Sequence, residues 1–369
     1  MGRFPQSFID DLKTQADIVQ VIQDTVPLKK AGSSYKGLCP FHTEKTPSFH
    51  VNRDKGFFHC FGCSAGGDVV KFIELYEKLS FPEAVRLLAQ RFSIEMPLSD
   101  DLERDAAADA ARESLLKIHE LASAYFQDQL TGSGGAVARA HLEGRDITPD
   151  TIDKLGLGFA PPQRESLKRH LIDAGQPLDL ILESGLVVER GSGQNIDRFR
   201  NRLMIPICRD TGSVIAFGGR ALTADQQPKY INSPETVLYT KGRTLYGLHL
   251  TKQAVRRLGY AVIVEGYFDF AQALQAAVQP VVATCGTAMT ERQVHLLRRF
   301  TSKAILSFDP DTAGQGASVR SGELLVAADF QVNVALLAHG EDPDTYVRRH
   351  GGTRYIKQLK TSQPYLEYV

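Results

Sequence analysis

The sequence predicts a multidomain chain that combines an α+β class with an α/β class. Two Cys/His pairs with equal internal spacing lie near the N-terminus, and a segment of mixed helical and extended patterning follows them. From Tyr260 onward, apolar strands alternate with helical stretches, which is typical of a parallel sheet built from βαβ units. The 369 residues suffice for two or three domains of about 100 to 200 residues each.

The first predicted domain covers residues 1–98. A short helix is expected over residues 7–23, followed by extended segments and then by apolar residues at helical spacing. Segment 99–112 is acidic and Ala-rich, and we expect a linker that enters a helix. Residues 113–242 are expected to form a mixed α+β subdomain with strands at 203–207 and 214–217.

Four candidate metal ligands form two pairs in the first domain. Cys39-Pro-Phe-His42 and Cys60-Phe-Gly-Cys63 each have two intervening residues, and seventeen residues separate the pairs. Thiolate sulfur and imidazole nitrogen are ligands that zinc prefers, and a filled four-ligand shell leaves no position for a reacting water. The spacing therefore predicts a zinc ribbon with one structural Zn²⁺.

Other interpretations exist for these residues and their neighbours. The two pairs could be ordinary buried cysteines with a surface histidine, and His50 and His59 compete with His42 as ligands. Cys208 and Cys285 stand alone in apolar segments, so we expect packed thiols. The phenylalanines of the region could stack on bases or form the domain's core; they are Phe49, Phe57, Phe58 and Phe61.

Acidic residues follow the predicted strands of the C-terminal half. The strands are expected at 261–264, 281–284, 304–308 and 332–337, and the acids are Glu265, Asp269, Asp309, Asp311, Asp342 and Asp344. Because ligands of open α/β sheets sit at the carboxyl ends of the strands, these acids are expected to converge. Converging carboxylates repel one another unless hard cations neutralise them, and this predicts magnesium.

Charge is balanced globally but not locally. The chain has 43 basic and 43 acidic residues, yet residues 190–257 contain twelve Lys or Arg against four Asp or Glu. A positive surface beside a negative pocket is expected. Five cysteines do not make a disulfide scaffold, and no apolar run approaches the length of a membrane span, so we expect a cytoplasmic protein without a membrane partner.

Several motifs resemble known families. Three acidic motifs resemble the Toprim module of primases, topoisomerases and some nucleases. They are Glu265-Gly266, Asp309-Pro-Asp311-Thr-Ala-Gly314 and the pair Asp342 and Asp344. The zinc ribbon ahead of this module and four basic motifs are similar to the bacterial replicative primase family of the DnaG type. These motifs are Arg198-Phe-Arg200-Asn-Arg202-Leu-Met-Ile-Pro, Phe217-Gly-Gly-Arg220, Lys229-Tyr-Ile-Asn232-Ser-Pro-Glu and Lys241-Gly-Arg243-Thr-Leu-Tyr-Gly-Leu.

The resemblance spans nearly the whole chain and implies a domain order. It implies a zinc-binding domain over 1–98, a linker over 99–112 and the N-terminal subdomain of an RNA polymerase core over 113–242. A Toprim domain over 243–345 and the start of a helical region over 346–369 would follow. In this family a C-terminal domain binds the replicative helicase, and we expect no helicase contact through the present residues.

The resemblance also implies an activity, which is the synthesis of short RNA primers on single-stranded DNA from nucleoside triphosphates. Two or more Mg²⁺ or Mn²⁺ ions would assist the transfer. It implies that Glu265, Asp309 and Asp311 are catalytic and that Asp269, Asp342 and Asp344 complete the metal shell. The implied nucleic-acid and nucleotide contacts are Arg145, Arg198, Arg200, Arg202, Arg220, Lys229, Asn232 and Lys241.

Two other functions stay open on the sequence alone. A non-catalytic DNA-binding module would bind single strands without making primers. A Toprim-type nuclease would degrade DNA without needing triphosphates. Each basic residue, taken singly, could also be a solvated surface charge.

Overall fold

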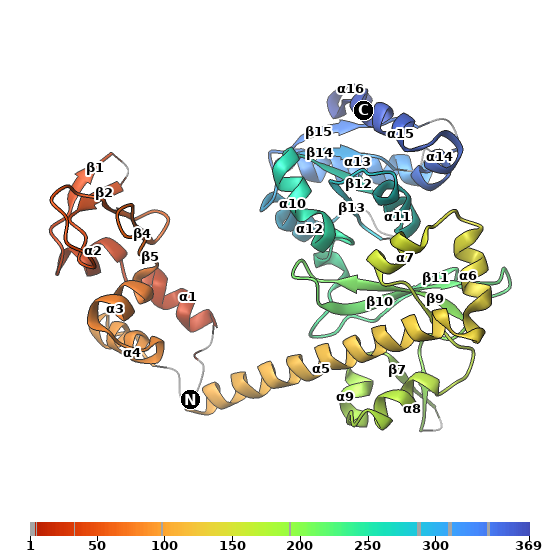
Figure 1. Ribbon diagram of the computed structural model, residues 1–369, viewed down its shortest axis with the longest axis horizontal. Coiled ribbons are helices and arrows are strands. Elements are labelled where there is room, and N and C mark those ends of the chain that lie inside the picture. The colour runs from red at the N-terminus through yellow and green to blue at the C-terminus, as the bar shows by residue number, and fades with distance from the viewer. Residues whose placement is uncertain are drawn as a thin grey trace. The chain divides into compact units, whose positions relative to one another are not determined.

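The computed structural model describes residues 4, 6–32, 34–96, 99–191, 193–285, 289–308, 312–337 and 340–369. The chain divides into two compact units, one ending at Ala110 and the other beginning at Ala111 (Figure 1). Each unit has its own apolar core.

The first unit is an antiparallel sheet accompanied by four short helices. The strands are hydrogen-bonded in the order of the chain and are β1 (Lys29–Ala31), β2 (Ser34–Gly37), β3 (Phe49–Asn52), β4 (Phe57–Cys60) and β5 (Gly66–Gly67). The helices are α1 (Gln6–Gln15), α2 (Ile18–Gln23), α3 (Val69–Glu77) and α4 (Phe81–Arg91).

The single helix expected over residues 7–23 is wrong, because the chain breaks between α1 and α2. Asp17 has extended rather than helical backbone angles, and its Oδ1 accepts hydrogen bonds from the amides of Val19 and Gln20 at 2.8 and 3.0 Å. An aspartate in this position satisfies amides that have no partner inside a helix, so it starts a new helix.

Strand alternation separates the four phenylalanines into two classes. Phe49 and Phe58 are fully buried, and their rings stack with centroids 5.3 Å apart. Phe57 and Phe61 are 41% and 72% exposed. Both interpretations of these residues therefore have support, because two of them form core and two are available at the surface.

The second unit begins in the long helix α5 (Ser99–Thr131), which runs through the segment expected as a linker. A four-stranded antiparallel sheet follows, in the order β11-β10-β9-β6. Its strands are β6 (Gly158–Ala160), β9 (Arg202–Cys208), β10 (Val214–Ala221) and β11 (Tyr230–Asn232), and the expected strands at 203–207 and 214–217 are confirmed within β9 and β10. The remaining elements of this part are η1 (Ser133–Gly135), α6 (Ala136–Glu143), α7 (Pro149–Leu155), α8 (Ser166–Asp173), α9 (Leu178–Glu183), β7 (Val187–Arg190) and β8 (Gln194–Asp197).

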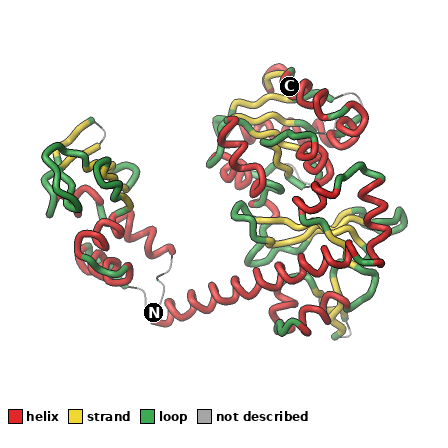
Figure 2. The backbone as a smooth tube through the Cα atoms, viewed as in Figure 1, coloured by secondary structure: helices red, strands yellow, loops and turns green. Residues whose placement is uncertain are grey.

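The expected parallel sheet is confirmed in the C-terminal half of this unit. Its order is β13-β12-β14-β15-β16, and only the last pairing is antiparallel. Figure 2 shows this sheet and the antiparallel sheet as separate strand-rich layers. The strands are β12 (Ala261–Val264), β13 (Val281–Ala283), β14 (Lys303–Leu306), β15 (Gln331–Val334) and β16 (Gln363–Pro364). The helices are η2 (Lys241–Arg243), α10 (Leu248–Leu258), α11 (Tyr267–Gln275), α12 (Glu291–Arg298), α13 (Thr312–Ala327), α14 (Pro343–His350), α15 (Gly352–Lys360) and α16 (Tyr365–Tyr368).

One histidine of the second unit is fully buried. His119 on α5 is fully buried, its ring stacks on Phe217 with centroids 6.0 Å apart, and its Nδ1 lies 2.8 Å from the carbonyl oxygen of Leu115. Among the described residues its Nε2 has no hydrogen-bond partner. Burial lowers the pKa of His119 to about 4, although the hydrogen bond to Leu115 opposes the shift.

We expect the second unit to lose stability as the pH falls from about 6.5 to about 4. In that range the unfolded chain takes up a proton at His119 that the folded chain excludes, so unfolding becomes more favourable by up to ~3 kcal/mol. The ring-preserving change His119→Phe should flatten this dependence, and urea denaturation at pH 7.5, 5.5 and 4.5 measures it. The exposed His295, changed in the same way, serves as the control, and parallel pH curves for wild type and His119→Phe would contradict the prediction.

Candidate functional site

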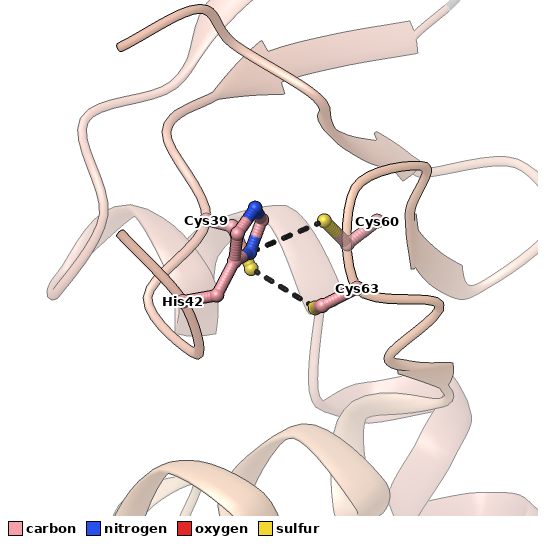
Figure 3. Close-up of side chains that lie close together, drawn as sticks. All are labelled: Cys39, His42, Cys60 and Cys63. Atoms are coloured by element: carbon pink, nitrogen blue, oxygen red, sulfur yellow. Dashed lines mark hydrogen bonds between the residues drawn. The ribbon is translucent and has the colours of Figure 1, made fainter. Parts of the chain in front are cut away.

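The four predicted zinc ligands lie together at the end of the first unit's sheet (Figure 3). The sulfur atoms of Cys39 and Cys63 are 3.7 Å apart, and Cys60 Sγ lies 3.8 Å from His42 Nδ1. A tetrahedral zinc with ordinary bond lengths places its ligand atoms about 3.6 to 3.8 Å from one another. The donor set and its spacing therefore fit zinc. The rivals His50 and His59 are not members of this cluster.

Neighbouring groups hold the ligands in place. The amide of Gly62 donates to Cys60 Sγ at 3.3 Å, and Ser48 Oγ lies 3.2 Å from the same sulfur. Burial disfavours the Cys60 thiolate, but these hydrogen bonds, together with those from the Cys63 amide and the Cys39 side chain, outweigh burial and lower the pKa of the Cys60 thiol. Glu44 contacts His42 Nε2 at 3.3 Å, and such a carboxylate fixes the orientation of a ligating imidazole.

A cleft of about 480 Å³ opens in the second unit and gathers most of the other predicted site residues. Eight of them line it, namely Arg145, Lys229, Asn232, Lys241, Glu265, Asp269, Asp342 and Asp344. The remaining lining residues are Tyr230, Gly266, Tyr267, Phe268 and Cys285. The acids come from the parallel-sheet region, whereas Lys229, Asn232 and Lys241 come from the antiparallel sheet and the segment after it.

The carboxylate of Asp269 connects two of the acidic segments. Asp269 accepts from the amide of Gly266 at 2.8 Å and from the amide of Asp344 at 3.1 Å, so its carboxylate joins the start of α11 to α14. Asp342 caps α14 by accepting from the amide of Thr345 at 2.7 Å. The bond between the Asp344 amide and Asp269 therefore holds two separate acidic segments against each other.

Asp344 has one paired and one unpaired oxygen. Its Oδ2 forms an ion pair with Arg145, and its Oδ1 is buried with no hydrogen-bond partner among the described residues. Burial raises the pKa of this carboxyl, and the charge of Arg145 opposes the rise. A buried carboxylate oxygen without a donor is a group that a bound cation would satisfy, so the acidic wall fits divalent metal ions.

Two lysines line the same cleft from elements other than those that carry the acids, and we call this part of the lining the cationic wall. Within the described part of the chain, neither Lys229 nor Lys241 forms an ion pair within 4.0 Å. Lys241 sits on η2, which α12 fixes through two side chains: Gln293 Nε2 donates to the carbonyl of Thr244 at 2.8 Å, and Thr290 Oγ1 donates to the carbonyl of Gly242 at 2.5 Å. The cation is thereby presented from a fixed turn.

Arg220 lies just beyond this wall, in a smaller pocket that shares Lys229 with the cleft. Its guanidinium contacts His141, donates to the hydroxyl of Tyr230 at 3.1 Å and lies 5.3 Å from the ring centre of Phe268. Burial, followed by the charge of Arg220, lowers the pKa of His141 to about 4. The histidine is therefore neutral near pH 7 and adds no charge of its own.

Three predicted contacts on the β8–β9 segment do not line the cleft. Arg198 donates through Nε to the carbonyl of Gly185 at 2.6 Å, and Arg200 donates to the carbonyl of Asp197. Arg202 is only 4% exposed and donates to the carbonyls of Gly219 and Pro228 at 3.1 and 2.9 Å. The Arg202 guanidinium thus braces the β10–β11 hairpin.

Two of the predicted catalytic acids, Asp309 and Asp311, lie outside the described residues.

The structure also shows cleft residues that the sequence interpretation did not assign to the site. Cys208 is buried as expected, and burial raises the pKa of its thiol to about 11, but Cys285 lines the cleft. Tyr267 directly follows Glu265-Gly266, and this position next to a predicted catalytic acid was the signal available in the sequence.

Comparisons with known proteins agree along the whole chain. Residues 4–104 match the family described as CHC2 zinc finger, residues 125–252 match the DNA primase catalytic core, N-terminal domain, and residues 262–347 match the Toprim-like family. A DNA primase from Halalkalibacterium halodurans is 42% identical over 360 residues, which are 97% of this chain and 59% of that protein. The chain thus spans about six tenths of the length of this relative.

Solved structures give the same result. The crystal structure of the Aquifex aeolicus primase, comprising its zinc-binding and RNA polymerase domains, matches 98% of this chain and 87% of that chain, with 34% identity and a TM-score of 0.65. The DnaG primase catalytic domain bound to single-stranded DNA matches 69% of this chain and 81% of that chain, with 33% identity and a TM-score of 0.64. No helix among the described residues is both long enough and apolar enough to cross a bilayer. By sequence and by fold, the chain belongs to the bacterial DNA primase family.

Proposed function

We propose that the chain is the zinc domain and catalytic core of a DNA primase, which synthesises short RNA primers on a single-stranded DNA template. The observation that carries this proposal is the cleft, where four carboxylates line the same cavity as Lys229 and Lys241 in a member of the primase family. Nucleotidyl transfer needs both, because a hydroxyl attacks the α-phosphate of a polyanionic triphosphate and pyrophosphate leaves.

In this proposal the acids hold two or more divalent ions, Mg²⁺ or Mn²⁺. Glu265, Asp309 and Asp311 are the catalytic ligands, and Asp269, Asp342 and Asp344 complete the shell. When bound, such ions stabilise the attacking and leaving oxygens of an in-line displacement. The assignment of Asp309 and Asp311 rests on the sequence motif alone.

The cationic residues bind the substrates. Lys229 and Lys241 neutralise the triphosphate, and Asn232 between them donates to a polar atom of the nucleotide. Arg145 and Arg220 stabilise phosphates at the margin of the cleft. Arg198, Arg200 and Arg202 belong to the template path, Arg202 by holding the hairpin that supports it. RNA primer and DNA template would share this surface.

The proposed zinc ligands and domain bounds rest on the similarity to the same family. Cys39, His42, Cys60 and Cys63 hold one structural zinc in a domain over residues 1–98. Segment 99–112 then links this domain to the polymerase subdomain at 113–242, and a Toprim domain occupies 243–345. The exposed Phe57 and Phe61 of the first unit offer rings on which single-stranded bases can stack.

Incubation with a single-stranded template, labelled triphosphates and Mg²⁺ or Mn²⁺ tests the proposal. We expect dinucleotides and longer RNA that depend on the template. We expect no RNA product when divalent metal is left out. DNA degradation that needs no triphosphates would instead establish the nuclease. Binding of DNA without either reaction would establish the non-catalytic module.

A further inference from the structure

Tyr267 connects the two walls of the cleft. It is the first residue of α11, two positions after Glu265, and its side chain is only 6% exposed. Its hydroxyl donates to Oδ1 of Asn232, on β11 of the antiparallel sheet, at 2.8 Å. The ring also packs edge-on against Tyr246, with centroids 4.9 Å apart.

The backbone of β10 lies in close contact with Tyr267. A Cβ on Gly218 would lie 2.8 Å from both Cζ and Oη of Tyr267, closer than a side chain tolerates. A glycine therefore lets the phenol pass β10 and reach Asn232 on the neighbouring strand. The two residues are 35 positions apart in the sequence, so this hydrogen bond forms only when the second unit is folded.

The direction of this hydrogen bond determines how Asn232 presents its amide. Burial raises the pKa of Tyr267 well above its ordinary value, so the phenol keeps its proton and can act as a donor. Asn232 is a residue of the cleft lining, and a donor engaged with its Oδ1 leaves its Nδ2 group to donate elsewhere. Without the phenol, neither orientation of the Asn232 amide is favoured, and the amide can rotate so that Oδ1 and Nδ2 exchange places.

We propose that Tyr267 is a positioning residue that orients Asn232, so that the amide NH₂ of Asn232 donates to an acceptor atom of the bound nucleoside triphosphate. This inference rests on the proposed function, because it names a determinant of nucleotide binding in the same cleft. Tyr267 itself makes no contact with the reacting atoms. Its hydroxyl also forms a hydrogen bond with Cys285, but the proposed effect on the nucleotide passes through Asn232.

The test is Tyr267→Phe, which keeps the ring and removes only the hydroxyl. We expect the KM for nucleoside triphosphates to rise about tenfold and kcat to change less than about twofold, since the lost preference affects binding alone. Tyr246→Phe is the matched control. It removes a phenolic hydroxyl from an equally buried neighbouring ring, which is 3% exposed, and it should leave KM unchanged.

A double-mutant cycle shows whether Tyr267 acts through Asn232. In an Asn232→Ala background, Tyr267→Phe should have no further effect on KM, because the group it orients is absent. Additive effects of the two substitutions, or an unchanged KM in Tyr267→Phe alone, would overturn the inference. A loss of kcat with unchanged KM would do so as well, since it would point to the alignment of the acids instead.

The wild-type protein separates this inference from the proposed function. If wild type makes no primers, the proposed function fails, and the binding constant for a non-hydrolysable triphosphate replaces KM in the cycle. If wild type makes primers and Tyr267→Phe binds triphosphate equally well, only the role of Tyr267 is wrong.

Discussion

Replacing Glu265 by glutamine is expected to reduce primer synthesis by a factor of about a hundred to a thousand. Glu265 follows β12 directly and lines the cleft, and the substitution keeps its shape while removing its charge. A neutral amide is a poor ligand for a hard divalent cation, so the charge on the reacting phosphate loses its compensation. Initial rates with saturating triphosphate and template measure the effect.

Binding of single-stranded DNA should not weaken in Glu265→Gln, because the proposed phosphate contacts are cationic and the substitution removes a negative charge. Asp329→Asn is the control, since it makes the same chemical change on a side chain that is 90% exposed. Synthesis at the wild-type rate in Glu265→Gln would show that this acid does not hold a catalytic ion. Loss of synthesis together with loss of DNA binding would indicate a folding defect.

Replacing Cys63 by serine is expected to unfold the first unit and leave the second unit folded. Cys63 provides one of four ligand atoms, and serine cannot replace a thiolate on zinc. Zinc binding contributes on the order of 10 kcal/mol to the folding of small zinc domains, which exceeds the stability of a core this small. The second unit has a separate apolar core and should unfold at its own temperature.

Zinc content by elemental analysis and the number of thermal transitions test this prediction together. Wild type should contain one zinc per chain and Cys63→Ser none, with the first unit open to proteolysis. Cys208→Ser serves as the control, because it removes a buried thiol of the second unit and should leave the zinc content at one. A Cys63→Ser protein that keeps its zinc would exclude Cys63 as a ligand.

The parts of the fold that could be predicted depend on short-range patterns. The paired spacing of Cys39, His42, Cys60 and Cys63 predicted a cluster of these four side chains, and the structure forms that cluster. Strands β12 and β13 were predictable because buried parallel strands are continuous apolar runs bounded by helices.

The parts that could not be predicted depend on contacts between distant segments. Arg202 looked like its neighbours Arg198 and Arg200 in the sequence, but the β10–β11 hairpin folds over it and takes up its donors. The role of Tyr267 depends on Gly218 and Asn232, which no periodicity connects to it. The break at Asp17 was readable in principle, since aspartate often begins a helix, but the apolar pattern continued across it.

The separation of charge between the two walls of the cleft has an electrical consequence. The carboxylates of the acidic wall and the ammonium groups of the cationic wall form a fixed dipole, whose field points from the lysines toward the acids. Low-dielectric walls concentrate such a field. A molecule with a polyanionic tail experiences a torque there and turns its tail toward the lysines before it touches either wall. Added salt shortens the range of this torque to roughly 8 Å at physiological ionic strength, so orientation at a distance should be lost before contact affinity is.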